Sequence, residues 1–280
     1  MRRAVIFGAT NTGRTIFKEI KDEWNVIAFV DENPKLWGSN IEDVPVYNPD
    51  DLLTLKYDFL YVGVLTYYME VMNRLHEMNI PSGKIIDRYV SIPTYARIEF
   101  LKQSKIMLEE EGISGYAVAE LGVYKGEFAK EINRIFPESK LYLFDTFEGF
   151  SEVDAVSERQ RGYTDNNQTG YFSDTSVQQV LNKMSFPNKC IVKKGFFPDT
   201  AEEIDENFVF VNIDVDLYEP ILSGLRWFYP RMVSGGVILV HDYFSTAFTG
   251  ARDAVKLFAE TSRVMFLPVG DTLSVALRKV

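Results

Sequence analysis

Apolar residues along the chain occur in short runs that alternate with amphipathic stretches, and this pattern begins twice. The first run, residues 4–7, stops at Gly8, and an amphipathic stretch leads to a second run that ends at Asp31. Further strand-like runs follow, with a helical pattern between them. Strands that alternate with helices predict a parallel sheet covered by helices. We therefore expect a small Rossmann-like α/β domain over residues 1–92.

A helical segment is predicted to connect this domain to the rest of the chain. Apolar side chains such as Ile98 and Leu101 have helical spacing, and Gly112 is a typical helix stop. We expect a connecting helix over residues 93–112 and a second domain over residues 113–280.

The second domain shows a longer alternation of strands and helices. Its predicted strands cover residues 116–121, 141–145, 190–193, 208–214 and 237–240. Its predicted helices cover residues 126–136, 217–228 and 249–260. Two final apolar runs are joined through Gly270 and Asp271, a tight turn that makes them pair antiparallel. We expect an α/β fold with a parallel sheet that ends in an antiparallel hairpin, which resembles the class I Rossmann-like methyltransferases.

Composition and charge exclude several classes of protein. The 280 residues carry a formal net charge of −10 at pH 7, whereas nucleic acid is bound through basic surfaces. No apolar stretch approaches the ~20 residues of a membrane-spanning helix, and the N-terminal run is too short for a signal peptide. Cys190 is the only cysteine, so we interpret it as a small buried apolar residue in a reducing compartment. We expect a soluble, cytoplasmic protein; the sequence leaves its oligomeric state open, a homo-oligomer included.

A glycine-containing loop follows the first strand of the second domain. Glu120, Gly122 and Gly126 border the turn from strand to helix, where glycines let the backbone turn tightly and approach a ligand. Asp145 ends the next strand, where a carboxylate accepts hydrogen bonds from both hydroxyls of an adenosine ribose. A structural interpretation stays open, because many α/β folds need a glycine turn here and aspartates also cap helices.

Acidic side chains end two later strands of the predicted sheet. Asp214 and Asp216 end one strand, and His241 and Asp242 end the next. The carboxyl ends of parallel strands line one crevice, where these groups repel one another unless a positive charge lies among them. A divalent cation supplies that charge, and oxygen-rich ligands favour Mg²⁺ or Mn²⁺. The alternatives are that the aspartates cap helices and that His241 is structural or a proton acceptor rather than a ligand.

Short motifs follow one another in order through residues 117–256 of the second domain. They are ELGVYKG at 120–126, LFDTFEGF at 143–150, DTS at 174–176, KGFFPDT at 194–200, IDVDLYEP at 213–220, FYPRMVSGG at 228–236 and HDY at 241–243. Together they resemble the macrocin O-methyltransferase family, metal-assisted enzymes that methylate sugar hydroxyls on natural products and related glycans.

The resemblance implies a set of binding residues. Glu120, Tyr124 and Gly126 would hold the methionine part of S-adenosylmethionine, Asp145 its ribose, and Gly195 and Phe196 its adenine. The full set expected at the cofactor is Glu120, Gly122, Tyr124, Gly126, Asp145, Thr146, Ser176, Gly195 and Phe196. The expected metal ligands are Asp214, Asp242 and His241, and the expected catalytic bases are Asp214 and His241. Relatives carry an acid or an amide where His241 stands.

The first domain opens with part of a dinucleotide-binding loop. Gly8 and Gly13 keep the outer glycines, Thr10 replaces the middle one, and Asp31 stands where a ribose-binding acid is expected. The segment looks like small nucleotide-binding-type domains attached to sugar-modifying enzymes. Three interpretations stay open: binding of the nucleotide or sugar portion of a substrate, a scaffold or oligomerisation module, and binding of a nicotinamide cofactor.

These observations predict an S-adenosylmethionine-dependent, Mg²⁺-assisted O-methyltransferase. Its expected acceptor is a hydroxyl of a sugar, a nucleotide sugar or a glycosylated natural product, with no nucleic acid or membrane as partner. The alternative is a nucleotide-sugar-binding or NAD-dependent sugar-modifying protein that uses the N-terminal domain. No Tyr-x-x-x-Lys pair follows Gly8 in that domain, which disfavours hydride chemistry. Residues 151–171, long and polar, are expected to lack regular structure and to close over the crevice, or else to be an exposed insertion.

Overall fold

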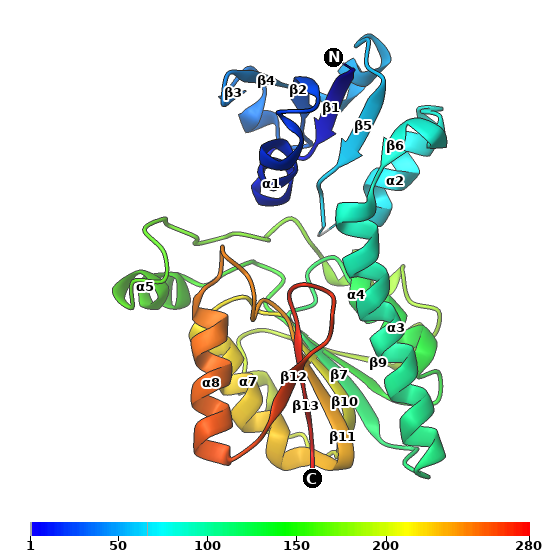
Figure 1. Ribbon diagram of the computed structural model, residues 1–280. Helices are drawn as coiled ribbons and strands as arrows, with labels where there is room; N and C mark the ends of the chain where they lie inside the picture. Colours follow the sequence, from blue (N-terminus) through cyan, green and yellow to red (C-terminus); the bar gives the residue numbers. More distant parts are fainter. Residues whose placement is uncertain (1, 66) are drawn as a thin grey trace. The chain divides into compact units, whose positions relative to one another are not determined.

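The computed structural model describes residues 2–65 and 67–280 of the chain. The chain forms two compact units, Met1–Tyr95 and Ala96–Val280, both drawn in Figure 1. Helix α3 (Arg88–Glu110) spans the division between them. It begins earlier than the connecting helix expected from residue 93, and Pro93 lies inside it. The missing N–H of this proline removes one intrahelical hydrogen bond without ending the helix.

A six-stranded sheet forms the centre of the first unit, in the order β3-β4-β2-β1-β5-β6. Its elements are β1 (Arg3–Phe7), α1 (Asn11–Ile20), β2 (Asn25–Val30), β3 (Asn40–Ile41), β4 (Val44–Tyr47), β5 (Phe59–Val62), α2 (Tyr68–Glu77) and β6 (Ile85–Ile86). All neighbouring strands pair in parallel except β3 and β4, which pair antiparallel with each other. The apolar pattern of the sequence did not predict these two short strands. In β1, Ala4 and Ile6 join one apolar layer and Val5 and Phe7 join another, so both faces of the sheet are covered.

A seven-stranded sheet forms the centre of the second unit, in the order β12-β13-β11-β10-β7-β8-β9. Its elements are β7 (Ala117–Leu121), α4 (Glu127–Ile135), β8 (Leu141–Asp145), α5 (Glu152–Gln160), α6 (Val177–Leu181), β9 (Cys190–Lys194), β10 (Phe208–Ile213), α7 (Tyr218–Phe228), β11 (Met232–Val240), α8 (Gly250–Ser262), β12 (Phe266–Pro268) and β13 (Val275–Arg278). The strands from β7 to β11 pair in parallel, whereas β13 pairs antiparallel with both β11 and β12. The predicted parallel sheet with a closing antiparallel hairpin is confirmed.

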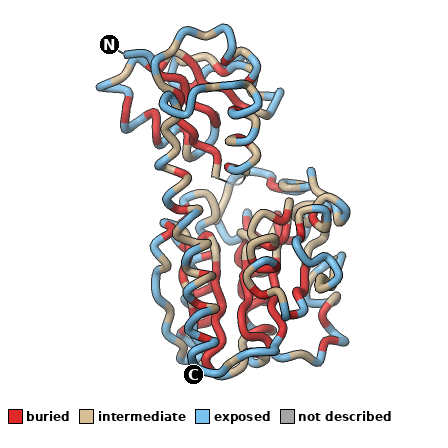
Figure 2. Tube along the Cα trace, turned by 90° about the vertical axis from the view of Figure 1, so that its right-hand side faces the viewer, coloured by how far each residue is buried: buried red, intermediate tan, exposed pale blue. Residues whose placement is uncertain are grey.

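Helices cover both faces of this second sheet. Ala119 and Leu121 of β7 belong to the apolar layer that includes α7 and α8, and Val118 belongs to the layer that includes α3 and α4. Figure 1 shows α7 and α8 on one side of the sheet and α3 and α4 on the other. Strands β7, β8 and β10 consist almost entirely of buried residues, and Figure 2 shows buried residues in the interior of the chain trace. Glu120 lies on the same side of β7 as Val118 and is only 2% exposed. A carboxylate is thus built into the end of an otherwise apolar strand.

Helix α5 lies in the polar interval for which we expected no regular structure. Ser151 caps it, because its hydroxyl accepts the Asp154 N–H at 3.0 Å. Glu158 of this helix is buried and accepts the N–H of Tyr218, the first residue of α7, at 2.7 Å. The sequence pattern misses the helix because hydrogen bonds, more than a stripe of apolar side chains, attach it to the domain. Closure of this segment over the site stays a prediction.

The remaining regular structure consists of short 3-10 helices. They lie at Pro34–Leu36, Pro49–Leu53, Ser82–Lys84, Pro187–Lys189, Asp199–Ala201 and Tyr229–Arg231. Among the described residues, no helix has both the length and the apolar character needed to cross a membrane.

Candidate active site

Three neighbouring strands bring the expected site residues to one edge of the second sheet. Ile213 pairs with Leu121 on one side and with Val240 on the other, so β7, β10 and β11 end at the same level. The backbone hydrogen bonds continue past the strand ends. The Asp214 N–H donates to the carbonyl oxygen of Leu121 at 2.8 Å, and the His241 N–H donates to the carbonyl oxygen of Ile213 at 2.9 Å. The cofactor loop and the acidic strand ends therefore lie together, as the rule for parallel strands predicts.

Gly122 makes this close approach possible. Its φ of +85° is in the left-handed region, and a Cβ built there would lie 2.0 Å from the carbonyl oxygen of Asp214. A side chain at this position would collide with backbone, which has little freedom to move. The glycine of the expected cofactor loop is thus required to pack the β7 loop against the β10 loop.

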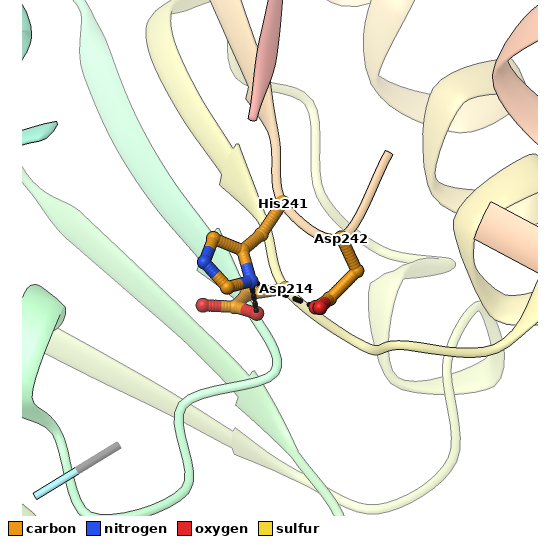
Figure 3. Close-up of side chains that lie close together, drawn as sticks. All are labelled: Asp214, His241 and Asp242. Atoms are coloured by element: carbon orange, nitrogen blue, oxygen red, sulfur yellow. Dashed lines mark hydrogen bonds and ion pairs between the residues drawn. The ribbon is translucent and has the colours of Figure 1, made fainter. Parts of the chain in front are cut away.

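Asp214, His241 and Asp242 form a compact cluster at these strand ends (Figure 3). The Nδ1 atom of His241 lies 3.1 Å from Asp214 Oδ1 and 2.7 Å from Asp242 Oδ2. One potential ligand atom from each of the three residues lies within 4.8 Å of the others. Asp216 and Asp242 have φ values of 60° and 61°, a left-handed backbone that is costly for non-glycine residues and common at functional sites.

Charges within the cluster shift the pKa values of its members. Burial opposes the charged form of His241, but the carboxylates of Asp214 and Asp242 outweigh it and raise the pKa of the imidazole to about 10. Burial also opposes ionisation of Asp214, yet the charges of His241 and Arg97 lower the pKa of this carboxyl below its ordinary value. Asp216 shows the opposite: burial, Asp242 and Asp214 all raise its pKa.

Arg97, on α3, is a site residue that the sequence analysis missed. Its Nη2 atom donates to Asp214 Oδ2 at 2.9 Å, and its side chain is 13% exposed. A signal was present: Arg97, Leu101, Ser104 and Leu108 have helical spacing, and the last three are buried. An arginine on the buried stripe of a helix calls for an anionic partner.

This arginine bears on one step of the metal argument. We expected a positive charge among the acidic strand ends, with a divalent cation as its proposed source, since like charges repel. Within the described residues, Arg97 already places positive charge beside Asp214. Charge repulsion alone therefore does not require a metal ion. The donor set still fits one, because two carboxylate oxygens and an imidazole nitrogen converge within 4.8 Å.

Glu120 is the most deeply buried of the expected cofactor residues that carry a charge. Its Oε1 atom accepts the amide N–H of Asn212 at 2.7 Å, whereas Oε2 has no hydrogen-bond partner among the described residues. Burial, followed by the charge of Asp214, raises the pKa of this carboxyl well above its ordinary value. The uncompensated oxygen is a candidate acceptor for a cationic ligand group.

Asp145 holds the cofactor loop in its shape. Its Oδ2 atom accepts the N–H groups of Val123 and Tyr124 at 2.7 and 2.8 Å, and its Oδ1 atom accepts that of Phe147 at 2.6 Å. The carbonyl of Asp145 accepts the N–H of Gly195 at 3.0 Å, which places Gly195 beside it. The aspartate therefore lies next to the loop at Gly122, in the place expected for a ribose-binding acid.

The remaining expected cofactor residues lie in loops at the same edge. Gly126 has a φ of 77° and precedes α4, and the Tyr124 hydroxyl donates to Asp174 at 2.6 Å. Thr146 donates to the carbonyl of Gly149 at 3.0 Å. Ser176 caps α6, and its neighbour Thr175 donates to the Tyr124 carbonyl. Phe196 is 42% exposed. These contacts give Thr146 and Ser176 structural hydrogen bonds, and their role at the cofactor stays a prediction.

The expected nucleotide residues of the first unit lie together at the ends of β1 and β2. Asp31 is buried, and its two oxygens accept the N–H groups of Ala9 and Asn33 at 2.7 and 2.8 Å. A Cβ at Gly13 would lie 1.8 Å from the Gly8 carbonyl oxygen. Both glycines and the aspartate thus have a structural reason to be present, and a nucleotide site here stays a prediction.

Fold and site together define the class of this protein. A parallel sheet with a closing antiparallel hairpin, a glycine loop after its first strand and acidic residues on the neighbouring strand ends describe a Rossmann-like methyltransferase. Residues 69–279 match the macrocin-O-methyltransferase (TylF) family, and the chain belongs to this family. It is therefore an S-adenosylmethionine-dependent O-methyltransferase. Residues 1–86 match a second family, C2185-like, N-terminal.

Two solved structures illustrate the likeness of the fold. The O-methyltransferase NovP is 20% identical, with a TM-score of 0.54 over 66% of this chain and 80% of that one. The calicheamicin methyltransferase CalS11 is 17% identical, with a TM-score of 0.54 over 78% of this chain and 94% of that one. None of the curated proteins compared with the chain matches its sequence significantly.

Proposed function

We propose that this enzyme transfers the methyl group of S-adenosylmethionine to a hydroxyl of a sugar, a nucleotide sugar or a glycosylated natural product, assisted by a divalent cation. The observation that carries the proposal is the cluster of Asp214, His241 and Asp242 beside the loop at Gly122. Membership of the macrocin O-methyltransferase family supports a glycosylated acceptor.

In this proposal Asp214, Asp242 and His241 hold the cation, with Mg²⁺ as the first candidate. A bound divalent ion lowers the pKa of an alcohol and orients its oxygen. Glu120, Gly122, Tyr124 and Gly126 would hold the methionine part of the cofactor, Asp145 the ribose, and Gly195 and Phe196 the adenine. Thr146 and Ser176 would complete the same site.

Transfer would occur in one displacement. The acceptor oxygen attacks the methyl carbon in line, the carbon–sulfur bond breaks, and S-adenosylhomocysteine leaves. The hydroxyl proton passes to a carboxylate oxygen of Asp214, whose pKa the neighbouring His241 and Arg97 lower. His241, which contacts Asp214, is the second candidate for proton transfer.

An aromatic cluster at the same edge supports a sugar acceptor. Phe150 contacts Phe172, Phe248 and Tyr171 with ring centroids 5.3, 6.1 and 6.4 Å apart, and Tyr124 contacts Phe172 at 5.2 Å. These rings come from the loops after β7, β8 and β11, and Tyr171 is 48% exposed. Aromatic faces combined with a few polar groups are typical of small-molecule sites.

The role of the first unit is a separate hypothesis. We propose that it binds the nucleotide or sugar portion of the substrate, with a scaffold or oligomerisation role as the alternative. The division into residues 1–92, 93–112 and 113–280 is part of this proposal. A binding assay of the whole chain with nucleoside diphosphate sugars, compared between wild type and Asn11→Ala at the start of α1, tests it.

Methyl transfer itself is tested with radiolabelled S-adenosylmethionine against a panel of nucleotide sugars and glycosylated natural products. We expect labelled product with at least one acceptor, loss of that product with EDTA, and recovery with Mg²⁺. Turnover that EDTA leaves unchanged would remove the metal from the proposal and keep the methyl transfer. Absence of product with every sugar-containing acceptor would contradict the proposed substrate class.

A further inference from the structure

Glu158 of helix α5 is a buried carboxylate that has no role in the proposed transfer. It is 2% exposed, and its Oε1 atom accepts the backbone N–H of Tyr218 at 2.7 Å. Tyr218 is the first residue of α7, and Leu217, which precedes it, has an apolar side chain that cannot cap the helix. The first N–H groups of a helix lack partners within that helix and favour negative charge. Glu158 therefore caps α7 from another element of the fold.

The other oxygen of this carboxylate lies at the start of helix α8. A Cβ built on Gly250, the first residue of α8, would lie 2.9 Å from Glu158 Oε2 and 3.0 Å from the Cβ of Tyr218. Because Gly250 has no side chain, the carboxylate can occupy this space. One buried carboxylate is thus placed between the first residues of two helices, where the backbone favours an anion.

Two side chains that follow α5 contact the same two helices. The Tyr163 ring stacks on that of Tyr218 with centroids 5.6 Å apart, and the Tyr163 hydroxyl donates to Asp253 of α8 at 3.1 Å. Arg161 pairs with Glu219 of α7, and its guanidinium lies 4.4 Å from the centroid of the Tyr218 ring. The end of α5 is therefore attached to the beginnings of both α7 and α8.

These two helices follow the loops that carry the acidic cluster. Tyr218 comes four residues after Asp214 in the chain. The loop of Asp242 is tied to α8, because the carbonyl oxygen of Tyr243 accepts the Nε–H of Arg252, a residue of α8, at 3.2 Å. A shift of either helix start would therefore move the loop before it, and with it the separation of Asp214 and Asp242.

We propose that Glu158 is a positioning residue for the acidic cluster. By holding the beginnings of α7 and α8 at one separation, it fixes the spacing of Asp214 and Asp242 and so sets the affinity for a divalent cation. Burial of a carboxylate costs free energy, and apolar side chains would attach α5 without this cost. The inference rests on the proposed cation site, and it assigns a role at that site to a helix that contributes no proposed ligand.

Binding of Mn²⁺ alone to the full chain tests the assignment, with free Mn²⁺ measured by electron paramagnetic resonance. Glu158→Met keeps the length of the side chain and removes its acceptor. We expect this variant to bind Mn²⁺ about tenfold more weakly, the lower end of the loss when a group that orients metal ligands is removed. Glu158→Gln keeps an oxygen that can accept the Tyr218 N–H, so its affinity should stay within about threefold of the wild type.

Asp154 provides a matched control, because it is a buried carboxylate of the same helix. Its Oδ2 atom accepts the hydroxyl of Ser151 at 2.7 Å, so this bond lies at the other end of α5, away from Glu158 in the helix. Asp154→Leu should therefore disturb α5 itself and change the affinity for Mn²⁺ by less than about twofold.

Amide hydrogen exchange gives a measurement that needs no metal ion. In Glu158→Met the Tyr218 N–H loses its acceptor, so exchange in residues 214–218 should become at least about tenfold faster, whereas Asp154→Leu should leave it unchanged. A melting curve checks that each variant folds, and Glu158→Ala replaces Glu158→Met if the latter does not.

The outcomes separate this inference from the proposed function. Wild-type Mn²⁺ binding that Glu158→Met leaves unchanged, or that Glu158→Gln weakens equally, would overturn the inference and leave the cation site in place. An equal loss in Asp154→Leu would mean that α5 acts only through the stability of the fold, which also overturns it. If the wild type binds no Mn²⁺, the proposed cation site is wrong, and the assignment of Glu158 to that site is wrong as well.

Discussion

At the scale of single residues, Asp214 is the residue through which Arg97 and His241 are connected. It contacts Arg97 through one carboxylate oxygen and His241 through the other, at 2.9 and 3.1 Å. These two contacts keep it ionised and fix both of its oxygens. A carboxylate that is charged, oriented and next to the cofactor loop can accept the proton of an alcohol whose own pKa a bound cation lowers.

Replacing Asp214 by Asn keeps the shape of the side chain and removes its charge. We expect turnover to fall at least ~10²-fold, because both a general base and a metal ligand are lost. S-adenosylhomocysteine affinity, measured by calorimetry, should change less than about threefold, since Asp214 is not one of the residues proposed to contact the cofactor directly. Asp205→Asn, at an exposed aspartate of the same unit, serves as control. Retained turnover in the Asp214 variant would show that another group accepts the proton.

The single cysteine provides a pH-dependent prediction. Burial raises the pKa of the Cys190 thiol to about 11, so about one thiol in a thousand is ionised at pH 8. Because the thiolate is the nucleophile, alkylation by iodoacetamide should be roughly 50-fold or more slower than in the unfolded chain at pH 8. The rate should rise about tenfold per pH unit up to pH 10. A rate in the native protein equal to that in urea would contradict burial as the cause.

At the scale of elements, the loops after β7 and β10 form the site by packing against each other. The contact is backbone to backbone, and Gly122 is the residue that allows it. His241 and Asp242 follow β11, the strand that pairs with β10. The positions of the three loops therefore depend on one another. A disturbance of the first loop should therefore reach the acidic cluster.

Gly122→Ala measures this coupling. Its Cβ would meet the Asp214 carbonyl at 2.0 Å, and its φ is +85°, so we expect a loss of unfolding free energy of about 2–5 kcal/mol from strain and overpacking. Gly115→Ala is a matched control, because Gly115 also has a positive φ, +82°, but open space around it. It should cost only about 1–2 kcal/mol. Chemical denaturation gives both values, and equal losses would mean that only the backbone conformation matters.

At the scale of the whole molecule, each unit has its own apolar core. Two clusters cover the faces of the first sheet, and two others cover the faces of the second. Every residue proposed to bind the cofactor or a metal lies in the second unit. Ligand binding is therefore linked directly to the stability of that unit.

Calorimetric unfolding of the full chain should show this linkage. We expect two unfolding transitions. At a ligand concentration of 100 Kd, S-adenosylhomocysteine should increase the free energy of unfolding of the second unit by about 2.7 kcal/mol and leave that of the first unit unchanged. Tryptophan fluorescence assigns them, because Trp24 and Trp37 lie in the first unit and Trp227 in the second. The Trp227→Phe variant should lose the fluorescence change of the ligand-sensitive transition. One transition that moves as a whole would contradict independent cores.

The sequence by itself determined the fold class and the family. Period-two and period-3.6 patterns are local, and they predicted the alternation of strands and helices and the closing hairpin that the structure confirms. Ordered motifs predicted the macrocin O-methyltransferase family, which residues 69–279 match. The short strands β3 and β4 and the hydrogen-bonded helix α5 escaped prediction because no apolar period marks them. The cofactor and metal assignments stay predictions.

Only the tertiary structure decided which charges meet. Arg97 bonds to Asn212 and Asp214, 115 and 117 residues further along the chain, and no local period carries such a pairing. Sequence reasoning offered a divalent cation as the positive charge among the acidic strand ends, whereas the fold also places an arginine beside Asp214. The physical reason is that electrostatic energy depends on distance in space. Distance along the chain becomes distance in space only when β7, β10 and α3 have packed together.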